Sequence, residues 1–325
     1  MTGITDFHTL TPDIFISAVE AAIKIPMTGL LSPLPSYINR VYEMQDMDGK
    51  RIIAKFYRPG RWSLEMLKEE HRYILDCHEE EIPVIPPIRL ANGSTLDQVN
   101  GVYFSVFPKK MGREFEIMEE EDWKRMGRVI GRMHIAGCRN GAPSRLRLHP
   151  ALSTKNDIRE LLESGTIPKP YVPSFQEVTQ RILDKITPLF DTIKTIRVHG
   201  DCHQKNLIFR PGEGIMIIDF DDMMTGPAVQ DLWLFLPDHL NRCRAEMDLI
   251  LEGYSQFREF DAKELKLIEP LRAMRMIYFL AWLARQSGDY QFKRNFPEWG
   301  SDQFWKNEIT DLYKQLQAIE SGENC

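Results

Sequence analysis

The segment VHGDCHQKNLIF, residues 198–209, places two histidines, Asp201 and Asn206 between apolar flanks. Asp201 precedes Asn206 by five positions, and Asp219 follows Asn206 by thirteen, directly after the apolar run IMII. A segment with so many polar groups does not usually lie between apolar flanks unless other parts of the fold hold it there. We expect Asp219, which directly follows an apolar run, to lie at the end of a strand.

The first hundred or so residues have the pattern of a mostly antiparallel sheet with one or two helices. Asp48 and Gly49 favour a tight turn between the strands RVYEM and RIIAKFY, and each proline of IPVIPPIRL biases the preceding residue away from helix. The predicted elements are helices at 12–23 and 63–78, strands at 40–44, 51–57 and 101–107, a Pro- and Ser-rich loop at 30–40 and an extended segment at 82–90.

From residue 120 onward, beginning with EEDWKRMGRVIGRMHIAG, the chain has a mainly helical pattern. Only two strand-like pieces interrupt it, NLIF at 206–209 and GIMIIDF at 214–220, which predict a hairpin around RPGEG. The Gly- and Pro-containing stretch near Pro108–Gly112 predicts a boundary, with one lobe at 1–108 and a second at 109–325. Two joined lobes form a cleft, which is where ligands usually bind.

The polar residues of the segment 198–209 suit phosphoryl transfer. His199, Asp201 and Asn206 have the spacing of the H-x-D-x-x-x-x-N catalytic loop of kinases. Such transfer needs a carboxylate that orients the acceptor hydroxyl and takes its proton, and oxygen ligands that hold Mg²⁺ against the phosphates of ATP. We expect Asp201 to be the proton acceptor, with Asn206 and Asp219 as ligands of Mg²⁺, which prefers hard oxygen donors.

The first lobe should supply a lysine that contacts the nucleotide phosphates. Lys55 lies in the apolar strand IIAKF, and a lysine among apolar neighbours normally has a partner. On the following helix Glu70 lies three positions after Leu67 and four before Ile74, on the inward stripe, so we expect a Lys55–Glu70 ion pair, with Glu69 as the alternative. The competing interpretation is that Lys55 marks an edge strand and the glutamates face solvent.

Other interpretations of the polar residues stay open. His199 and His203 have a spacing that metal ligands use, but no further His or Cys lies nearby to complete a zinc site, so we expect His199 to be a structural hydrogen-bonding residue. IIDFDD resembles the D-x-D start of aspartyl-nucleophile phosphatases, yet those usually have Thr or Val where this chain has Met223. Asp221 and Asp222 either add to the metal site or are solvated.

The motifs resemble those of the protein-kinase-like fold, in its aminoglycoside and choline kinase branch. In that branch the catalytic loop typically reads H-G-D-x-x-x-x-N and the metal-binding aspartate lies in IDF, as in VHGDCHQKNLIF and IIDFDD here. Further segments between about Ser36 and Arg285, among them KFYRPGRW, DDMMTGPAVQDLW and IEPLRAMRMIYFLAWLAR, are similar to bacterial stress-response kinases of this branch.

The resemblance implies an α+β, two-lobed fold with an antiparallel β-rich, nucleotide-binding first lobe and a mainly helical second lobe that carries catalysis. It also implies a cytoplasmic Mg²⁺- and ATP-dependent serine/threonine protein kinase that acts in envelope- and oxidative-stress survival. By motif position, Lys55 would contact the phosphates, Ser36 would lie near the nucleotide, and Asp231 would brace the catalytic loop from the next helix.

The chain departs from ordinary protein kinases in several places. No G-x-G-x-x-G precedes Lys55, Gly200 replaces the Arg of H-R-D, and GPAVQDLW follows IDFDD too closely for an activation loop, so control by activation-loop phosphorylation is not expected. The alternative function is a small-molecule kinase for an aminoglycoside, choline or homoserine-like acceptor, since the acidic run DFDD would suit a cation. An inactive nucleotide-binding scaffold is disfavoured because every catalytic position is filled.

Composition argues against other classes. The formal net charge of −6 gives no basic field for nucleic acid, and the most apolar run, residues 276–284, is about half the ~20 residues that span a bilayer. MTGITDFHTLTPD lacks the features of a secretory signal, and five scattered cysteines without a CxxC pair indicate a reducing cytoplasm. We expect a cytoplasmic monomer with a Ser/Thr protein substrate and with neither a nucleic acid nor a membrane partner.

Overall fold

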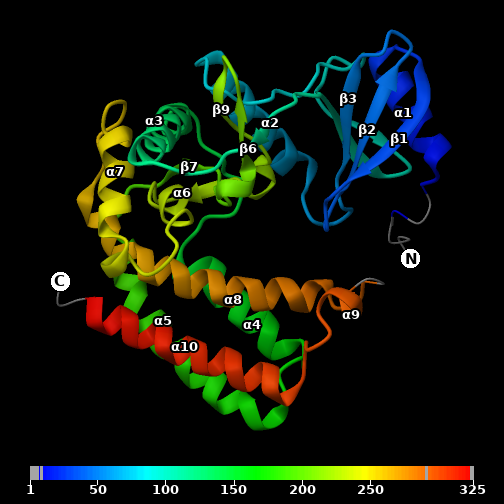
Figure 1. The fold of residues 1–325 in the computed structure, drawn as a ribbon. Coiled ribbons are helices and arrows are strands. Elements are labelled where there is room, and N and C mark those ends of the chain that lie inside the picture. Colours follow the sequence, from blue (N-terminus) through cyan, green and yellow to red (C-terminus); the bar gives the residue numbers. More distant parts are fainter. Residues whose placement is uncertain (1–6, 8–9, 290–291, 323–325) are drawn as a thin grey trace. The chain divides into compact units, whose positions relative to one another are not determined.

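The computed structural model describes residue 7, residues 10–289 and residues 292–322, so that Cys325 lies outside the described residues (Figure 1). The chain divides into two compact units, each assembled from three segments. The first unit comprises residues 1–117, 135–145 and 204–222, and the second comprises residues 118–134, 146–203 and 223–325. The lobes expected at 1–108 and 109–325 stay a prediction; the first compact unit also takes in two later segments.

The first unit contains a five-stranded antiparallel sheet in the spatial order β1-β2-β3-β5-β4. Its strands and helices are β1 (Met27–Leu34), β2 (Arg40–Asp46), β3 (Arg51–Phe56), β4 (Asp97–Val99), β5 (Val102–Pro108), α1 (Pro12–Ile23) and α2 (Leu64–Glu79). Gly49 has a φ of +82° in the β2–β3 turn, which costs a glycine little. Both predicted helices, the β2–β3 hairpin and the strand after Gly101 are confirmed.

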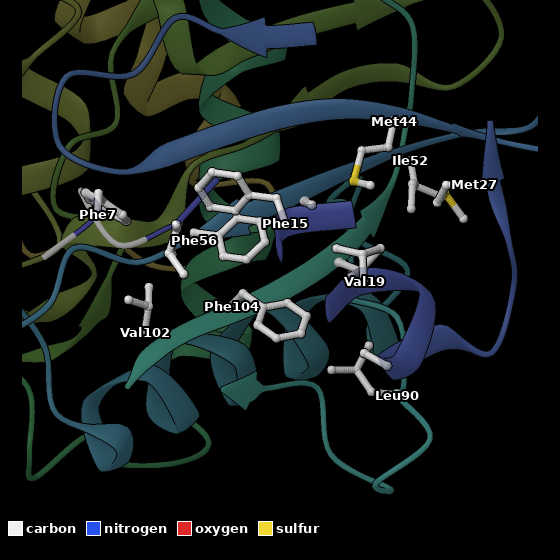
Figure 2. Close-up of a cluster of buried hydrophobic side chains, with 14 residues drawn as sticks. Phe7, Phe15, Val19, Met27, Met44, Ile52, Phe56, Leu90, Val102 and Phe104 are labelled. Carbon is white, nitrogen blue, oxygen red and sulfur yellow. The ribbon is translucent and has the colours of Figure 1, made fainter. Parts of the chain in front are cut away.

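Side chains of β3 alternate between the two faces of the sheet. Ala54 and Phe56 are fully buried in an apolar cluster with α1, where the ring of Phe15 packs against that of Phe56 with centroids 4.5 Å apart (Figure 2). Lys55 lies on the opposite face, within 3.9 Å of Glu70 of α2. Because the apolar core occupies one face of this central strand, the other face is left for a charged group.

The segment LLSPLPSYINR was expected to be a loop, and for its first half this expectation is wrong. β1 extends through Leu34 and pairs antiparallel with β2. β1 is an edge strand, so Pro33 removes no hydrogen bond that a second neighbouring strand would need. An irregular register between Met27 and Leu31, with Gly29 at a φ of +84°, disturbs the side-chain alternation by which a strand is normally recognised.

Three more strands of the first unit form a small antiparallel sheet in the order β6-β8-β9. They are β6 (Arg113–Glu114), β8 (Leu207–Arg210) and β9 (Gly214–Ile217). The β8–β9 hairpin confirms the prediction made from NLIF and GIMIIDF. Positive φ angles at Gly212 and Gly214 let the chain turn tightly between the two strands.

The second unit is mainly helical, and α3 runs through into the first unit. Its elements are α3 (Glu120–Gly137), α4 (Lys155–Glu163), α5 (Val172–Phe190), β7 (Ile196–Val198), β10 (Met224–Gly226), α6 (Gln230–Trp233), α7 (Arg244–Tyr254), α8 (Ile268–Gln286), α9 (Phe292–Asn295) and α10 (Asp302–Gly322). β7 and β10 pair antiparallel. The expectation of only two strands after residue 120 is therefore wrong, because strands of three residues are too short to show alternation.

Helices α3 and α7 approach each other at two glycines. A Cβ atom on Gly127 would lie 2.0 Å from the carbonyl oxygen of Ile250, and a Cβ atom on Gly253 would lie 2.0 Å from that of Lys124. Distances this short would overlap the neighbouring backbone. Only glycine therefore lets the two helices pack at this separation.

Helix α8 contains the most apolar run of the chain. Leu280, Ala281 and Leu283 are buried in it, whereas Phe279 is 46% exposed. Among the helices that the structure describes, none is both long enough and apolar enough for a membrane crossing. Among the cysteines that the structure describes, Cys77, Cys138, Cys202 and Cys243, none forms a disulfide bond with another.

Candidate active site

The β8–β9 hairpin brings Asn206 and Asp219 to the same end of one small sheet. Asn206 ends a short 3₁₀ turn directly before β8, and Asp219 follows the last residue of β9 by two positions. The backbone N–H of Ile218 donates to the carbonyl oxygen of Asn206 at 3.0 Å, which extends the pairing one step beyond Leu207 and Ile217. The hairpin thus joins two residues that are thirteen positions apart in sequence.

Asp219 has a backbone conformation that is uncommon for a residue with a side chain. Its φ is +64°, in the left-handed region, and its side chain is 53% exposed. Asn206 in contrast is 9% exposed. One amide and one carboxylate oxygen form a donor set that suits Mg²⁺ shared with phosphate oxygens. Within the described residues no group of three or more His, Cys, Asp or Glu side chains is arranged to hold a metal ion.

Lys55 is a buried cation among carboxylates of its own unit. Its Nζ donates to Asp221, lies 3.2 Å from Oδ1 of Asp219 and lies 3.9 Å from Oε1 of Glu70. Burial by itself lowers the pKa of Lys55, but the surrounding carboxylates, Asp221 first, outweigh it and raise the pKa well above its ordinary value. The lysine is therefore charged, and β3 is a central strand, so the edge-strand interpretation is wrong.

Asp221, which the sequence left between a metal ligand and a solvated residue, is 6% exposed. It accepts hydrogen bonds from Lys55 and from the Nδ2 of Asn39, and its Oδ2 lies 3.8 Å from Nη1 of Arg61. Burial raises the pKa of Asp221, but the charge of Lys55 and its neighbours lowers it more, and the net shift is downward. Asp222 pairs with Nη2 of Arg61 at 2.5 Å. The acidic run is thus compensated by positive charges.

Glu70, and not Glu69, lies beside Lys55. Glu70 is 1% exposed, its Oε2 lies 3.8 Å from Nη2 of Arg145, and burial raises its pKa. Glu69 instead accepts hydrogen bonds from the backbone N–H groups of Ser144 and Arg145, at 3.1 and 3.0 Å. The two adjacent glutamates of α2 therefore have different tasks, one at the lysine and one at a loop that positions Arg145.

Ser36 is linked to Asp221 through one intermediate residue, Asn39. Its Oγ accepts a hydrogen bond from the backbone N–H of Asn39 at 3.3 Å, and the amide of Asn39 donates to Asp221. Ser36 itself is exposed. The side chain therefore helps to fix the turn between β1 and β2 on the side of the sheet that carries Lys55.

The H-G-D motif lies in the second unit, directly after β7. Asp231 of α6 accepts hydrogen bonds from the backbone N–H groups of His199 at 2.6 Å and of Gly200 at 2.8 Å. Its Oδ2 also lies 3.0 Å from Nε2 of His134, and all three of His134, His199 and Asp231 are fully buried. Gly200 has a φ of +86°, which explains why this position of the loop carries glycine. A buried carboxylate thus fixes the two residues before Asp201.

Asp201 is partly exposed and lies next to two basic side chains. Nη2 of Arg275, on α8, donates to its Oδ1 at 2.8 Å, and Nε2 of His203 lies 3.3 Å from its Oδ2. The side chain of Asp201 is 27% exposed. Burial raises its pKa, but the hydrogen bonds and charges of His203 and Arg275 outweigh this and lower the pKa below its usual value. Asp201 is therefore ionised at neutral pH.

The residues singled out in the sequence fall into two groups. Those in the first unit are Ser36, Lys55, Glu70, Asn206 and Asp219, and those in the second unit are His199, Asp201 and Asp231. The chain passes from the second unit to the first between His203 and Gln204. The catalytic-loop motif therefore contributes to both units.

Four polar residues at these groups were not singled out from the sequence, namely Asn39, Arg61, Arg145 and Arg275. Asn39 and Arg61 contact aspartates more than 150 positions away, and Arg275 contacts one 74 positions away. Arg145 contacts the carbonyl oxygen of Asp221 and lies 4.3 Å above the ring of Trp62. No local spacing marks such residues, although Arg61 lies inside KFYRPGRW and Arg275 inside IEPLRAMRMIYFLAWLAR, two segments that carried the family resemblance.

Comparison with known proteins assigns the chain to a family. Residues 31–268 match the phosphotransferase enzyme family, APH. Stress response kinase A of Escherichia coli (strain K12) is 38% identical over 321 residues, which cover 97% of this chain and 95% of that protein. Serine/threonine protein kinase RdoA of Salmonella typhimurium is 36% identical over 315 residues, which cover 96% and 94%.

Solved structures share the fold at low sequence identity. Amicoumacin kinase hAmiN, solved in complex with AMP-PNP, Ca²⁺ and Ami, has a TM-score of 0.73 at 18% identity and covers 97% of this chain and 95% of its own. The microcompartment-associated aminopropanol kinase has a TM-score of 0.71 at 16% identity, with 95% and 97% covered. The kinase-like α+β fold and the resemblance to stress-response kinases are thereby confirmed, and the chain belongs to the phosphotransferase enzyme family.

Proposed function

We propose that this protein transfers the γ-phosphoryl group of ATP to a Ser or Thr hydroxyl of a protein, with Mg²⁺ as cofactor. The observation that carries the proposal is the buried Lys55, which lies on a central strand next to Asp219 and Glu70. A charged lysine held in this way suits a nucleotide triphosphate, because its position is fixed before the phosphates arrive. The names of the relatives support a kinase of stress response, which we place in the cytoplasm.

The hairpin residues suit the metal that such a nucleotide carries. Asn206 and Asp219 would hold Mg²⁺, which when bound neutralises charge on the phosphates. Lys55 would contact the phosphates in place of one of its carboxylate partners, while Glu70 of α2 stays beside the lysine. The complex of hAmiN with AMP-PNP and Ca²⁺ is consistent with a nucleotide and a divalent cation in this fold.

Asp201 is the proposed proton acceptor. Because its pKa is lowered, the carboxylate is ionised and can accept a hydrogen bond from an alcohol. Asp231 holds the backbone of His199 and Gly200 and so limits the positions that Asp201 can take. Asp201 therefore orients the acceptor hydroxyl and takes its proton as the new P–O bond forms, while the bond from the γ-phosphorus to the bridging oxygen breaks and ADP leaves.

A second candidate function is a small-molecule kinase with the same catalytic residues. The observation that favours it is the similarity to solved structures of an amicoumacin kinase and an aminopropanol kinase. At 16–18% identity that similarity concerns the fold, whereas the relatives at 36–38% identity are named stress response kinase and serine/threonine protein kinase. We therefore keep the protein acceptor as the leading proposal.

The variant Asp201→Asn tests the catalytic assignment. It keeps the shape of the side chain but removes the proton acceptor, so we expect phosphate transfer from labelled ATP to a Ser/Thr peptide library to fall by at least ~10²-fold. Binding of Mg²⁺ and an ATP analogue, measured by calorimetry, should persist, because Lys55, Asn206 and Asp219 are unchanged.

A matched control is Asp248→Asn, which alters an exposed aspartate paired with Arg244 on α7. This variant should keep its full rate of transfer. Retained turnover in Asp201→Asn would contradict the role of Asp201, and absence of transfer by the unmodified protein to any acceptor would contradict the proposed activity as a whole.

A further inference from the structure

Arg275 is the residue of α8 that contacts the proposed proton acceptor. Its Nη2 donates to Oδ1 of Asp201 at 2.8 Å, and its side chain is 40% exposed. Nε2 of His203 lies 3.3 Å from the other carboxylate oxygen. Arg275 therefore already occupies one oxygen of the Asp201 carboxylate. An acceptor whose hydroxyl forms a hydrogen bond to Asp201 must bind next to this guanidinium group.

The other arginines of α8 have partners of a different kind. Arg285 pairs with Asp157 and Glu160 of α4, and its contact to Glu160 measures 2.7 Å. Arg272 donates to the carbonyl oxygen of Asp238 at 2.9 Å and lies 3.4 Å from Glu269. These two guanidinium groups are held by structural carboxylates or carbonyls. Arg275 is instead held by a carboxylate that must become available to the acceptor.

An arriving hydroxyl competes with Arg275 for Oδ1 of Asp201. As the hydroxyl takes this oxygen, the guanidinium keeps its positive charge and needs a new hydrogen-bond acceptor nearby. A carboxylate on the acceptor molecule can supply it, because the fork of an arginine matches the two oxygens of a carboxylate. An ammonium group at the same place would instead meet a like charge.

The acidic run IDFDD no longer favours a cationic acceptor. Asp219 and Asp221 contact Lys55, and Asp222 pairs with Arg61 at 2.5 Å. The negative charges of these carboxylates are thus balanced by basic side chains of the same unit. The side chains next to Asp201 are instead basic, namely Arg275 and His203, which is positively charged when protonated.

We propose that Arg275 selects the acceptor: it binds a carboxylate that the acceptor carries close to its reacting hydroxyl, and it disfavours acceptors whose nearby group is an ammonium. The proposal rests on the phosphoryl transfer proposed above and narrows its substrate class. The carboxylate has two possible sources, an acidic residue adjacent to Ser or Thr in a protein, or the carboxylate of a small hydroxy amino acid such as homoserine.

Three matched peptides with one central Ser test the selection. They differ only in the residues on either side of the Ser, which are Glu, Gln or Lys, and kcat/KM is measured for each with Mg²⁺ and labelled ATP. We expect the Glu peptide to exceed the Lys peptide by about tenfold or more, the ratio that corresponds to about 1.4 kcal/mol. Homoserine and kanamycin are measured alongside, so that a free amino acid and a cationic acceptor are compared with the peptides.

Substitutions at Arg275 should change this ratio. In Arg275→Met and Arg275→Gln the ratio of Glu to Lys peptide should fall to near one, and in Arg275→Glu it should invert. In the control Arg285→Met, on the same helix but paired with Asp157 and Glu160, the ratio should stay at the value of the unmodified protein. Circular dichroism checks that each variant is folded.

The outcomes separate this proposal from the proposed function. Three outcomes would overturn the role of Arg275 but not the proposed kinase activity. They are equal rates of transfer to all three peptides, a preference for the Lys peptide or kanamycin, and a ratio of Glu to Lys peptide that is unchanged in Arg275→Met. A preference for homoserine over every peptide would support Arg275 and identify the small-molecule source. Absence of transfer to every acceptor would overturn both proposals. Where the variants fail to fold, the ratio in the unmodified protein decides.

Discussion

Glu264 is a buried carboxylate whose task is to hold the helix that carries Asp231. It lies in the 3₁₀ segment Ala262–Leu267, is 3% exposed, and accepts a hydrogen bond from the backbone N–H of Val229 at 2.8 Å. Val229 directly precedes α6. Burial raises the pKa of Glu264 to about 7, although hydrogen bonds from the backbone oppose the shift. The protonation state of Glu264 therefore depends on pH at the place where this side chain holds the start of α6.

The raised pKa predicts a stability change with a definite sign. The folded protein holds the proton of Glu264 up to about pH 7, whereas the unfolded chain releases it near its ordinary pKa of 4.5. The contribution of this group to the free energy of unfolding therefore falls as the pH rises from about 4.5 to about 7 and is constant above.

The variant Glu264→Gln, which has no proton to lose, should not share this fall. Relative to the unmodified protein, its free energy of unfolding should rise by roughly 2 to 3 kcal/mol across that window. Urea denaturation at pH 5, 6, 7 and 8 measures the difference. Two stability curves that run parallel over this range would contradict the assignment.

At single residues, the sequence predicted what depends on local spacing. Strand alternation at Lys55 and helix spacing at Glu70 suggested their pairing, and both residues lie on elements whose patterns are regular. The closest partner of Lys55 is nevertheless Asp221, which the sequence left undecided. That contact depends on the Asp219 backbone turning through a left-handed conformation, and no residue pattern specifies such a turn in a non-glycine residue.

At the level of elements, the α3–α7 contact depends on two glycines. Because Cβ atoms at Gly127 and Gly253 would lie 2.0 Å from backbone oxygens of the facing helix, an alanine at either position must push the helices apart. We expect Gly253→Ala to lower the free energy of unfolding by roughly 1 to 3 kcal/mol, in the range of overpacked cores. Thermal unfolding followed by circular dichroism measures the loss.

Gly288→Ala provides the comparison for this prediction. A Cβ atom at Gly288 would have no neighbouring atom within 4 Å, and the φ of this residue is not in the left-handed region. The free energy of unfolding of Gly288→Ala should stay within about 0.5 kcal/mol of that of the unmodified protein, as for ordinary surface substitutions. Equal stabilities of Gly253→Ala and Gly288→Ala would show that the helices tolerate a wider separation.

Elements with a clear period or turn signal were predicted correctly, whereas the irregular β1 and the three-residue strands β7 and β10 were not. The helices α1, α2 and α3 and the β2–β3 and β8–β9 hairpins follow from periodicity and turn residues. β1 was missed because its register shifts near Gly29, and β7 and β10 were missed because three residues cannot display a period. The stability of such strands comes from partners distant in the chain, which one sequence does not reveal.

At the level of the whole molecule, the chain crosses between its two compact units inside the catalytic-loop motif. Asp201 and His203 belong to the second unit, and Gln204 and Asn206 belong to the first. The spacing of this motif suggests a chemistry that stays a proposal, and it does not predict this division, because compactness depends on contacts from segments far apart in the chain. Positions such as Arg275, which the motif does not contain, became visible only with the fold.

A crystal structure of the protein with Mg²⁺ and AMP-PNP tests the central claim most directly. Our account predicts Mg²⁺ bound to oxygens of Asn206 and Asp219, and Nζ of Lys55 in contact with the phosphates. It also predicts that the carboxylate of Asp201 faces the terminal phosphate. A nucleotide bound away from Lys55, or a metal ion held by neither Asn206 nor Asp219, would contradict the account.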